Sequence, residues 1–290
     1  MIGHNKITVI TINYNNKIGL IKTIQSVINQ DIKDFEFVVI DGGSDDGSRE
    51  LILDCPRINN WISEKDNGVY NAMNKGIKIA KGEYIIFMNS GDIFYDNSVL
   101  SIFLPELNNN YGIVYGNSLY YNKSGYLREE FPPEKLTFGF FRGGGINHQA
   151  VLIKRKLFFD HFFYEESYKI CADWDFFFRM VCLKKITYKY IDIFVCKYDF
   201  SGISADPDNY ARYIEERDFT LKTYFDPLCD TLYSLYGDNK KLKRYNQFLF
   251  LNHYKLAWKA VGLLMKFCLL FIHKKKKNNL YIFNKYLQNI

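Results

Sequence analysis

The chain has 290 residues, of which 48% are hydrophobic and 24% are charged, and this is the composition of an ordinary globular protein. The net charge of +6 is unevenly spread: residues 239–290 carry 12 Lys or Arg and no Asp or Glu, and the remainder carries 26 basic against 32 acidic residues. Six cysteines form no C-x-x-C pair, and no histidine stands at zinc-finger spacing, which excludes a zinc finger and favours free thiols. No amino-terminal signal peptide is predicted, so we expect a cytoplasmic protein.

The amino-terminal half predicts strands that alternate with helices. Ile7–Ile12 is a β-branched run followed by the polar segment Asn13–Asn16, after which apolar residues recur at helical spacing as far as Ile28. Phe35–Ile40 predicts a second strand, which ends in a turn rich in glycine and aspartate. Strands joined by helices within roughly 25–30 residues indicate right-handed βαβ units and a parallel sheet.

Two further segments extend this pattern. A polar loop, Glu64–Gly68, leads into a helix whose buried stripe is predicted to be Val69, Met73, Ile77 and Ala80, with Asn71, Asn74 and Lys75 off the stripe. Tyr84–Met88 predicts a buried central strand, and ligands of α/β sheets gather beyond the carboxyl ends of such strands. Asp92 stands at that end, beside backbone amides of Ser90 and Gly91, and could hold a divalent cation. A simple Asx or glycine turn explains the same residues without a ligand.

The carboxyl-terminal half contains two more polar stretches. Ile113–Gly116 predicts another strand, and a glycine-rich segment leads to His148, which is commonly a structural hydrogen-bonding residue. Asp173 opens a predicted helix, where a carboxylate is often only a cap. The buried face of this helix is predicted to include Trp174, Phe177, Phe178 and Val181. Residues 186–200 favour a strand, and residues 206–226 favour a helix.

The basic tail predicts contact with a membrane surface. Leu256–Ile272 is apolar apart from Lys259 and Lys266, and its basic residues fall on one side of a helix. A helix lying in the interface, with Lys274–Lys277 at anionic headgroups, is favoured over a spanning helix. The alternative is a helix packed in the core beside a solvated lysine run. No recognisable RNA-binding module is present, so no nucleic acid partner is expected.

Four blocks in this order and spacing resemble the family 2 glycosyltransferases. They are the strand ending in Asn-Tyr-Asn, the turn Asp41–Ser48, the segment Glu64–Gly76 and the motif Phe87–Asp92, within a resemblance that covers roughly residues 5–205. Members of this family are inverting enzymes of the GT-A fold that use nucleotide sugars. The resemblance is strongest to the branch that builds bacterial surface polysaccharides, namely the O-antigens of lipopolysaccharide, capsules and exopolysaccharides.

The resemblance implies a role for each matching residue. The residues matched to the donor nucleotide are Asn13, Tyr14, Asp41, Asp66, Asn71, Lys75, Ser90 and Gly91. Asp92 matches the last carboxylate of the family's DxD-type motif and would hold Mn²⁺ or Mg²⁺, although Asn89 and Gly91 replace the earlier carboxylates. His148 and Trp174 match positions near the donor sugar and the acceptor. Asp173 matches the catalytic base, which takes the proton of the acceptor hydroxyl as it attacks the anomeric carbon.

We therefore expect an α/β catalytic domain of the GT-A type over residues 1–215, followed by a helical, basic extension over residues 216–290 at the inner face of the cell membrane. The expected reaction moves a hexosyl or N-acetylhexosaminyl group, preferably from a UDP-sugar, to a hydroxyl of a glycan or lipid-linked acceptor. One alternative is a sugar nucleotidyltransferase, which would want a basic, glycine-rich phosphate loop where residues 13–16 stand. Another is a catalytically inactive scaffold at the membrane, suggested by the two missing carboxylates.

Overall fold

The computed structural model describes residues 6–122, 124–202 and 206–229. The chain divides into two compact units, Met1–Asp226 and Pro227–Ile290. The helix expected over residues 256–272 and the lysine run at 274–277 lie outside the described residues. Within the described ranges, every helix is too short or too polar to cross a bilayer.

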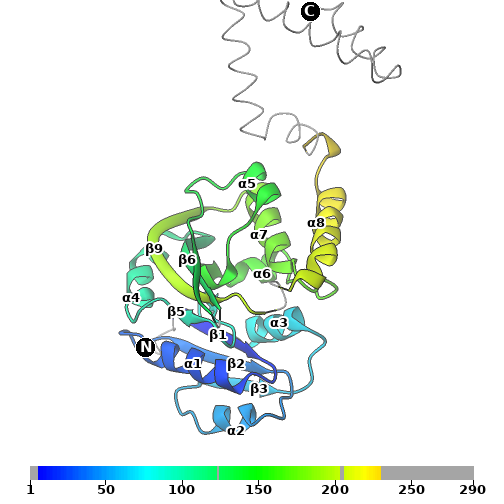
Figure 1. Cartoon of the computed structure of the whole chain (residues 1–290). Helices are drawn as coiled ribbons and strands as arrows, with labels where there is room; N and C mark the ends of the chain where they lie inside the picture. The colour runs from blue at the N-terminus through cyan, green and yellow to red at the C-terminus, as the bar shows by residue number, and fades with distance from the viewer. Residues whose placement is uncertain (1–5, 123, 203–205, 230–290) are drawn as a thin grey trace, which may run out of the picture. The chain divides into compact units, whose positions relative to one another are not determined.

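The amino-terminal half forms a parallel sheet, as the sequence predicts. Strands β1 (Ile7–Asn13), β2 (Glu36–Asp41), β3 (Asn60–Ser63) and β4 (Tyr84–Phe87) lie side by side in the order β3-β2-β1-β4. Helices α1 (Lys17–Ile28), α2 (Ser48–Leu53) and α3 (Val69–Ile79) connect them (Figure 1). Side chains of β1 point alternately to α3 and to α1, so both faces of the strand are buried. Because both faces are buried, the sequences of such strands are nearly continuous apolar runs.

The sheet continues with strands of mixed direction. Strand β8 (Val151–Lys154) runs antiparallel to β4 and to β6 (Ile113–Asn122), and β6 runs parallel to β9 (Tyr188–Asp199). The short strand β5 (Ile93–Phe94) pairs with β9 at the edge, and β7 (Gly125–Glu130) forms a hairpin with β6. The result is a mixed α/β fold of the expected GT-A type.

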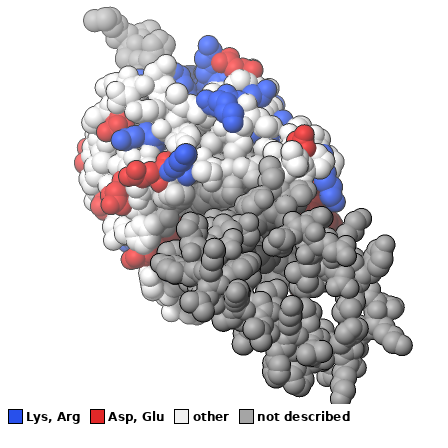
Figure 2. Space-filling view, turned by 90° about the horizontal axis from the view of Figure 1, so that it is seen from above, with Lys and Arg blue, Asp and Glu red and all other residues white. Residues whose placement is uncertain are grey.

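The remaining helices of the described part are short except for two. They are α4 (Val99–Phe103), α5 (Phe138–Gly143), α6 (Lys156–Asp160), α7 (Ala172–Cys182) and α8 (Tyr210–Tyr224), with short 3₁₀ helices at Leu104–Asn109 (η1), His148–Ala150 (η2) and Pro207–Asn209 (η4). Figure 1 shows α7 and α8 side by side, in green and yellow, and they are in contact. Figure 2 shows basic and acidic side chains interspersed on one face of the molecule.

Helix α7 is buried on more sides than its predicted face. Phe176 and Met180 are buried as well, because α6 covers the opposite side: the rings of Phe158 and Phe176 stack with centroids 4.4 Å apart. Asp175 is also buried, and it bonds Arg179 at 2.9 Å and the hydroxyl of Thr220 at 2.9 Å. Thr220 belongs to α8, so the expected domain boundary at residue 215 falls inside a helix that the first compact unit contains.

Asn74 departs from the position that the apolar stripe of α3 predicts. It is buried rather than solvated, because its amide group bonds the backbone of Tyr164 in both directions and donates to Glu166. A polar side chain can be buried at little cost when its hydrogen bonds are satisfied. Asn74 therefore fixes the loop before α7 to α3.

Candidate active site

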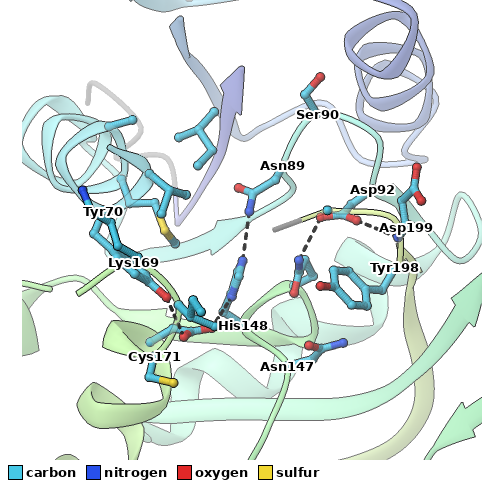
Figure 3. A pocket seen from close by; sticks show the side chains of 18 of the residues that line it. Tyr70, Asn89, Ser90, Asp92, Asn147, His148, Lys169, Cys171, Tyr198 and Asp199 are labelled. Atoms are coloured by element: carbon cyan, nitrogen blue, oxygen red, sulfur yellow. Dashed lines mark hydrogen bonds and ion pairs between the residues drawn. The ribbon is translucent and has the colours of Figure 1, made fainter. Parts of the chain in front are cut away.

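A cavity of about 1060 Å³ opens at the carboxyl ends of β1, β4 and β9. This is the edge at which ligands of open α/β sheets bind. Its walls come from the loops that follow these strands, the glycine-rich segment 144–149, the start of α7 and two residues of α8. Figure 3 shows side chains of both halves of the sheet facing one another across it.

A chain of polar contacts around Asp173 crosses this cavity. Oδ2 of Asp173 lies 2.6 Å from Nδ1 of His148, and Nε2 of the same ring lies 3.0 Å from the amide nitrogen of Asn89. Oδ1 of Asp173 accepts hydrogen bonds from the hydroxyl of Tyr70 at 3.1 Å and from the backbone N–H of Trp174 at 2.9 Å. Both oxygens of the carboxylate are thus held in place, while Asp173 still lines the cavity.

These contacts keep Asp173 ionised. Burial alone would raise the pKa of Asp173, but the hydrogen bond and charge of His148, with the donors of Trp174 and Tyr70, outweigh it and lower that pKa below its usual value. Burial raises the pKa of Tyr70 well above its usual value, and the neighbouring Asp173 raises it further, so Tyr70 keeps its proton. A fixed, charged carboxylate that faces a cavity is suited to accept a proton from a substrate.

Asp92 lies on the opposite wall and is only 4% exposed. Its Oδ2 accepts a hydrogen bond from Nε2 of Gln149 at 2.8 Å, and its Oδ1 accepts one from the backbone N–H of Asp199 at 2.9 Å. Burial raises the pKa of Asp92 to about 7, and the negative charge of Asp199 adds to this effect. Asp92 therefore joins the loop after β4 to the end of β9.

Asp41 is fully buried and does not line the cavity. Its two oxygens accept five hydrogen bonds, from Asn13, the backbone N–H groups of Gly43 and Ser44, and the hydroxyls of Ser44 and Ser63. Burial would raise the pKa of Asp41, but these bonds outweigh it and lower the pKa. Asp41 thereby shapes the turn after β2 and holds the side chain of Asn13 at the end of β1. Its implied contact with the nucleoside stays a prediction.

Tyr14 and Asp66 form the outer part of this wall. A Cβ atom added to Gly42 would lie 3.1 Å from the ring of Tyr14 and 3.1 Å from Oδ2 of Asp66, so both side chains lie close against Gly42. The ring of Tyr14 is 69% exposed. A planar ring beside a carboxylate offers a surface on which a flat, polar ligand can stack.

Lys75 and Asn71 support the same wall from behind and do not line the cavity. The ammonium group of Lys75 lies 2.5 Å from Asp66 and 2.8 Å from Glu64. The amide nitrogen of Asn71 donates to Glu166 at 2.8 Å, and its oxygen accepts from the backbone of Asn67 at 3.3 Å. Both residues therefore fix the loop over residues 64–67.

The structure brings most of the residues expected at the site to one cavity. Those that line it are Asn13, Tyr14, Asp66, Ser90, Asp92, His148, Asp173 and Trp174, whereas Asp41, Asn71, Lys75 and Gly91 lie behind its walls. Gly91 is held by hydrogen bonds of its backbone, because its N–H donates to Thr23 and its carbonyl accepts from the hydroxyl of Tyr121.

Three residues at or beside the cavity were not expected from the sequence. Tyr70 of α3 contacts Asp173. Arg217 of α8 donates hydrogen bonds to the carbonyls of residues 141, 142 and 144, and its guanidinium lies 4.2 Å from the ring of Trp174. Asp199 ends β9 and lines the cavity. Of these three, only Asp199 had a signal in the sequence: it lies near the carboxyl end of the predicted strand 186–200, as Asp92 lies beyond the carboxyl end of the predicted strand 84–88.

Comparisons with known proteins agree with this architecture. The family model described as glycosyl transferase family 2 matches residues 8–163. A PGL/p-HBAD biosynthesis glycosyltransferase of Mycobacterium tuberculosis is 29% identical over 189 residues, which are 62% of this chain and 72% of that protein. An uncharacterized glycosyltransferase of the same organism is 30% identical over 207 residues, which are 69% of this chain and 77% of that protein.

Two solved structures with a similar fold contain a bound nucleotide sugar. TarS of S. aureus, residues 1–349 in complex with UDP-GlcNAc, matches with a TM-score of 0.60 at 16% identity over 81% of this chain and 74% of that chain. The mannosyltransferase PcManGT of Pyrobaculum calidifontis, in complex with GDP-Man and Mn²⁺, matches with a TM-score of 0.51 at 14% identity over 89% and 83%. Because the family model covers more than half of the chain, the protein belongs to glycosyl transferase family 2 and is a glycosyltransferase.

Proposed function

We propose that the protein transfers a sugar from a nucleoside diphosphate donor to a hydroxyl of a glycan or lipid-linked acceptor, with inversion at the anomeric carbon, in the assembly of a surface polysaccharide. The observation that carries this proposal is the Asp173 carboxylate, held ionised in the cavity by His148 and Tyr70. Inverting transfer needs one such base, because the acceptor hydroxyl must lose its proton as it attacks. Family membership favours this reaction over nucleotidyl transfer.

The wall formed by Asn13, Tyr14 and Asp66 is the proposed seat of the donor nucleoside. The exposed ring of Tyr14 suits stacking on a base, and the amide oxygen of Asn13 is buried without a hydrogen-bond partner among the described residues. Such an oxygen is satisfied by a ligand that brings an N–H group, which uracil and guanine both carry. TarS binds UDP-GlcNAc and PcManGT binds GDP-Man, so both nucleotides belong in the donor screen, with UDP-sugars favoured.

Asp92 is the proposed ligand of Mn²⁺ or Mg²⁺ beside the donor diphosphate. The donor set fits a hard cation, because each carboxylate oxygen of Asp92 accepts a single hydrogen bond and the adjacent amide oxygen of Gln149 is buried without a described partner. The described ranges contain no group of three or more His, Cys, Asp or Glu side chains placed to hold an ion, so the diphosphate itself would complete the coordination. When bound, the cation stabilises the charge that develops on the leaving diphosphate.

His148 and Trp174 border the proposed acceptor side. His148 orients Asp173 by its 2.6 Å contact, and it is itself held by Asn89. The indole N–H of Trp174 donates to the carbonyls of Phe141 and Gly144, which fixes the ring in the wall. Gly145 lies against this ring, since a Cβ there would come within 2.9 Å of it.

The test combines a donor screen with an isosteric variant. Release of nucleoside diphosphate is measured with UDP- and GDP-sugars and a lipid-extract acceptor, for the wild type, for Asp173→Asn and for the control Asp160→Asn on α6, outside the cavity. Asp173→Asn should lower turnover by at least the ~10²–10⁴ typical of a lost general base while leaving donor affinity nearly unchanged. Turnover of a folded Asp173→Asn protein near that of the wild type would end the assignment.

We also propose peripheral binding to the inner face of the cell membrane, on the charge of the sequence alone. Residues 239–290 carry +12 and the rest of the chain −6, and each basic residue near an anionic bilayer contributes roughly 1 kcal/mol. Full-length protein should sediment with anionic vesicles in a salt-sensitive manner, and a chain ending at residue 238 should remain in the supernatant. Full-length protein that ignores such vesicles at low salt contradicts this proposal.

A further inference from the structure

A carboxylate from β9 lies beside the position at which the Asn89–Asp92 motif lacks one. Gly91 stands where the motif would carry an earlier carboxylate, and its φ of +110° is a conformation that side chains other than glycine rarely adopt. A Cβ atom at Gly91 would lie 3.3 Å from Oδ2 and 3.6 Å from Cβ of Asp199. The space next to position 91 is therefore filled by the side chain of Asp199.

The backbone on both sides holds Asp199 in this position. Asp199 is the last residue of β9, where it is paired with Tyr121 of β6. The backbone N–H of the next residue, Phe200, donates to the carbonyl of Tyr121 at 2.7 Å. The backbone N–H of Asp199 donates to Oδ1 of Asp92 at 2.9 Å. Figure 3 shows the two aspartates next to each other on one wall of the cavity.

The side chain of Asp199 keeps one oxygen available. Its Oδ1 accepts a hydrogen bond from the hydroxyl of Ser201 at 2.6 Å, whereas none of the described residues donates to Oδ2. The same Oδ2 is the atom nearest to the missing Cβ of Gly91. This oxygen therefore lies in the space directly beside position 91.

A second feature of this wall indicates a ligand. Gln149 is 2% exposed and lines the cavity, and while its nitrogen is bonded to Asp92, its oxygen has no partner within the described part of the chain. Native proteins leave few buried polar atoms unpaired, and such an atom usually meets a water, an ion or a substrate. Two carboxylates and one amide oxygen form a set of hard oxygen donors, which divalent cations such as Mn²⁺ and Mg²⁺ prefer.

We propose that Asp199 is the second carboxylate of the seat for the cation and the donor diphosphate, acting with Asp92 in place of the carboxylate absent from position 91. This inference rests on the proposed function, because it takes the ligand to be a nucleoside diphosphate with its cation. It assigns half of the seat to a residue 107 positions away from Asp92 in the chain. The two carboxylates of the proposed site thus come from the loop after β4 and from the end of β9 rather than from one motif.

The test measures Mn²⁺ binding rather than turnover. Full-length wild type, Asp199→Asn, Asp199→Glu and the control Asp192→Asn, on the same strand but outside the cavity, are titrated with Mn²⁺ in the presence of UDP, or of GDP if the wild type binds only that nucleotide. Asp199→Asn should weaken Mn²⁺ binding at least tenfold, and Asp199→Glu, which keeps the charge, should recover part of the loss. Nucleotide affinity without metal should change less than twofold, and thermal unfolding identifies any variant that fails to fold.

The outcomes separate this inference from the proposed function. Wild type that binds neither UDP nor GDP overturns both. Wild type that binds nucleotide and Mn²⁺ together, with Asp199→Asn binding Mn²⁺ equally well, overturns only the role of Asp199. If Asp199→Asn does not fold, Asp199→Glu decides, because its longer side chain displaces the carboxylate: Mn²⁺ affinity below that of the wild type supports the role of Asp199, and Mn²⁺ affinity equal to that of the wild type overturns it.

Discussion

Glu216 links α8 to the start of the helix that carries Asp173. Its carboxylate, in a side chain that is 8% exposed, accepts hydrogen bonds from three consecutive backbone N–H groups: Lys169 at 2.7 Å, Ile170 at 3.0 Å and Cys171 at 2.9 Å. These residues lead directly into α7, whose first turn contains Asp173. Glu216 lies outside the segment matched by the family model and past the expected domain boundary at residue 215. We predict that it is needed both for stability and for the placement of the base.

The size of the effect follows from these three bonds. A hydrogen bond to a charged group contributes about 1.5–3 kcal/mol, and a buried donor left unpaired costs about 1–3 kcal/mol. Water will reach part of the loop once the carboxylate is gone, so the three losses do not add fully. We expect Glu216→Ala to lower the free energy of unfolding by about 3–5 kcal/mol. A displacement of Asp173 by about 1 Å would lower turnover by roughly 10²-fold.

The assay is urea unfolding together with steady-state kinetics, and Glu215→Ala is the matched control because Glu215 is the exposed neighbour on the same helix. Donor affinity should be preserved in Glu216→Ala under native conditions, since Tyr14 and Asp66 belong to other elements. Glu216→Gln, which keeps one acceptor oxygen without the charge, should fall between wild type and Glu216→Ala. The reasoning fails if Glu216→Ala unfolds at the same urea concentration as Glu215→Ala.

Two further predictions concern the carboxylates of the cavity. The substitution Tyr70→Phe removes one of the hydrogen bonds that lower the pKa of Asp173. The acid limb of the pH profile of kcat/KM should therefore move toward higher pH by up to about one pH unit, and an acid limb that does not move contradicts this prediction. Burial raises the pKa of Asp92 from 3.8 to about 7, so its carboxyl binds a proton more tightly in the folded than in the unfolded chain. The stability it contributes is complete below about pH 4 and is lost as the pH rises through 7. In metal-free buffer the free energy of unfolding of the wild type should therefore fall by up to roughly 4 kcal/mol, relative to that of Asp92→Asn, between pH 4 and pH 8. A difference between the two proteins that stays constant over this range would refute the prediction.

The parallel half of the sheet was predictable because its signals are local. Ile7–Ile12, Phe35–Ile40 and Tyr84–Met88 are apolar runs of strand length bounded by turn residues, and both faces of the strands they form are covered. Asp92 and Asp173 were found for a similar reason, since each stands at the end or start of a recognisable element. The predicted fold class and family are confirmed.

The state of each carboxylate was not predictable in the same way. In the sequence Asp41 and Asp66 both stand in polar segments after apolar runs, yet Asp41 accepts five hydrogen bonds and Asp66 lines the cavity. The difference arises because the turn after β2 points three donors of Gly43 and Ser44 at the Asp41 side chain, while the ends of β1 and β3 add Asn13 and Ser63. Hydrophobic periodicity carries no information on that path.

The sequence also does not predict contacts between segments that are far apart in the chain, and these contacts connect the parts of the site. Tyr70 meets Asp173 across 103 residues, and Asp199 meets Asp92 across 107. Asn89 and Asp92 stand on one loop after β4, and through them this loop touches His148, and hence the base, on one side and Asp199 on the other. One short loop therefore holds both contacts, and it joins the proposed site of the cation and diphosphate to the hydrogen-bonded support of Asp173.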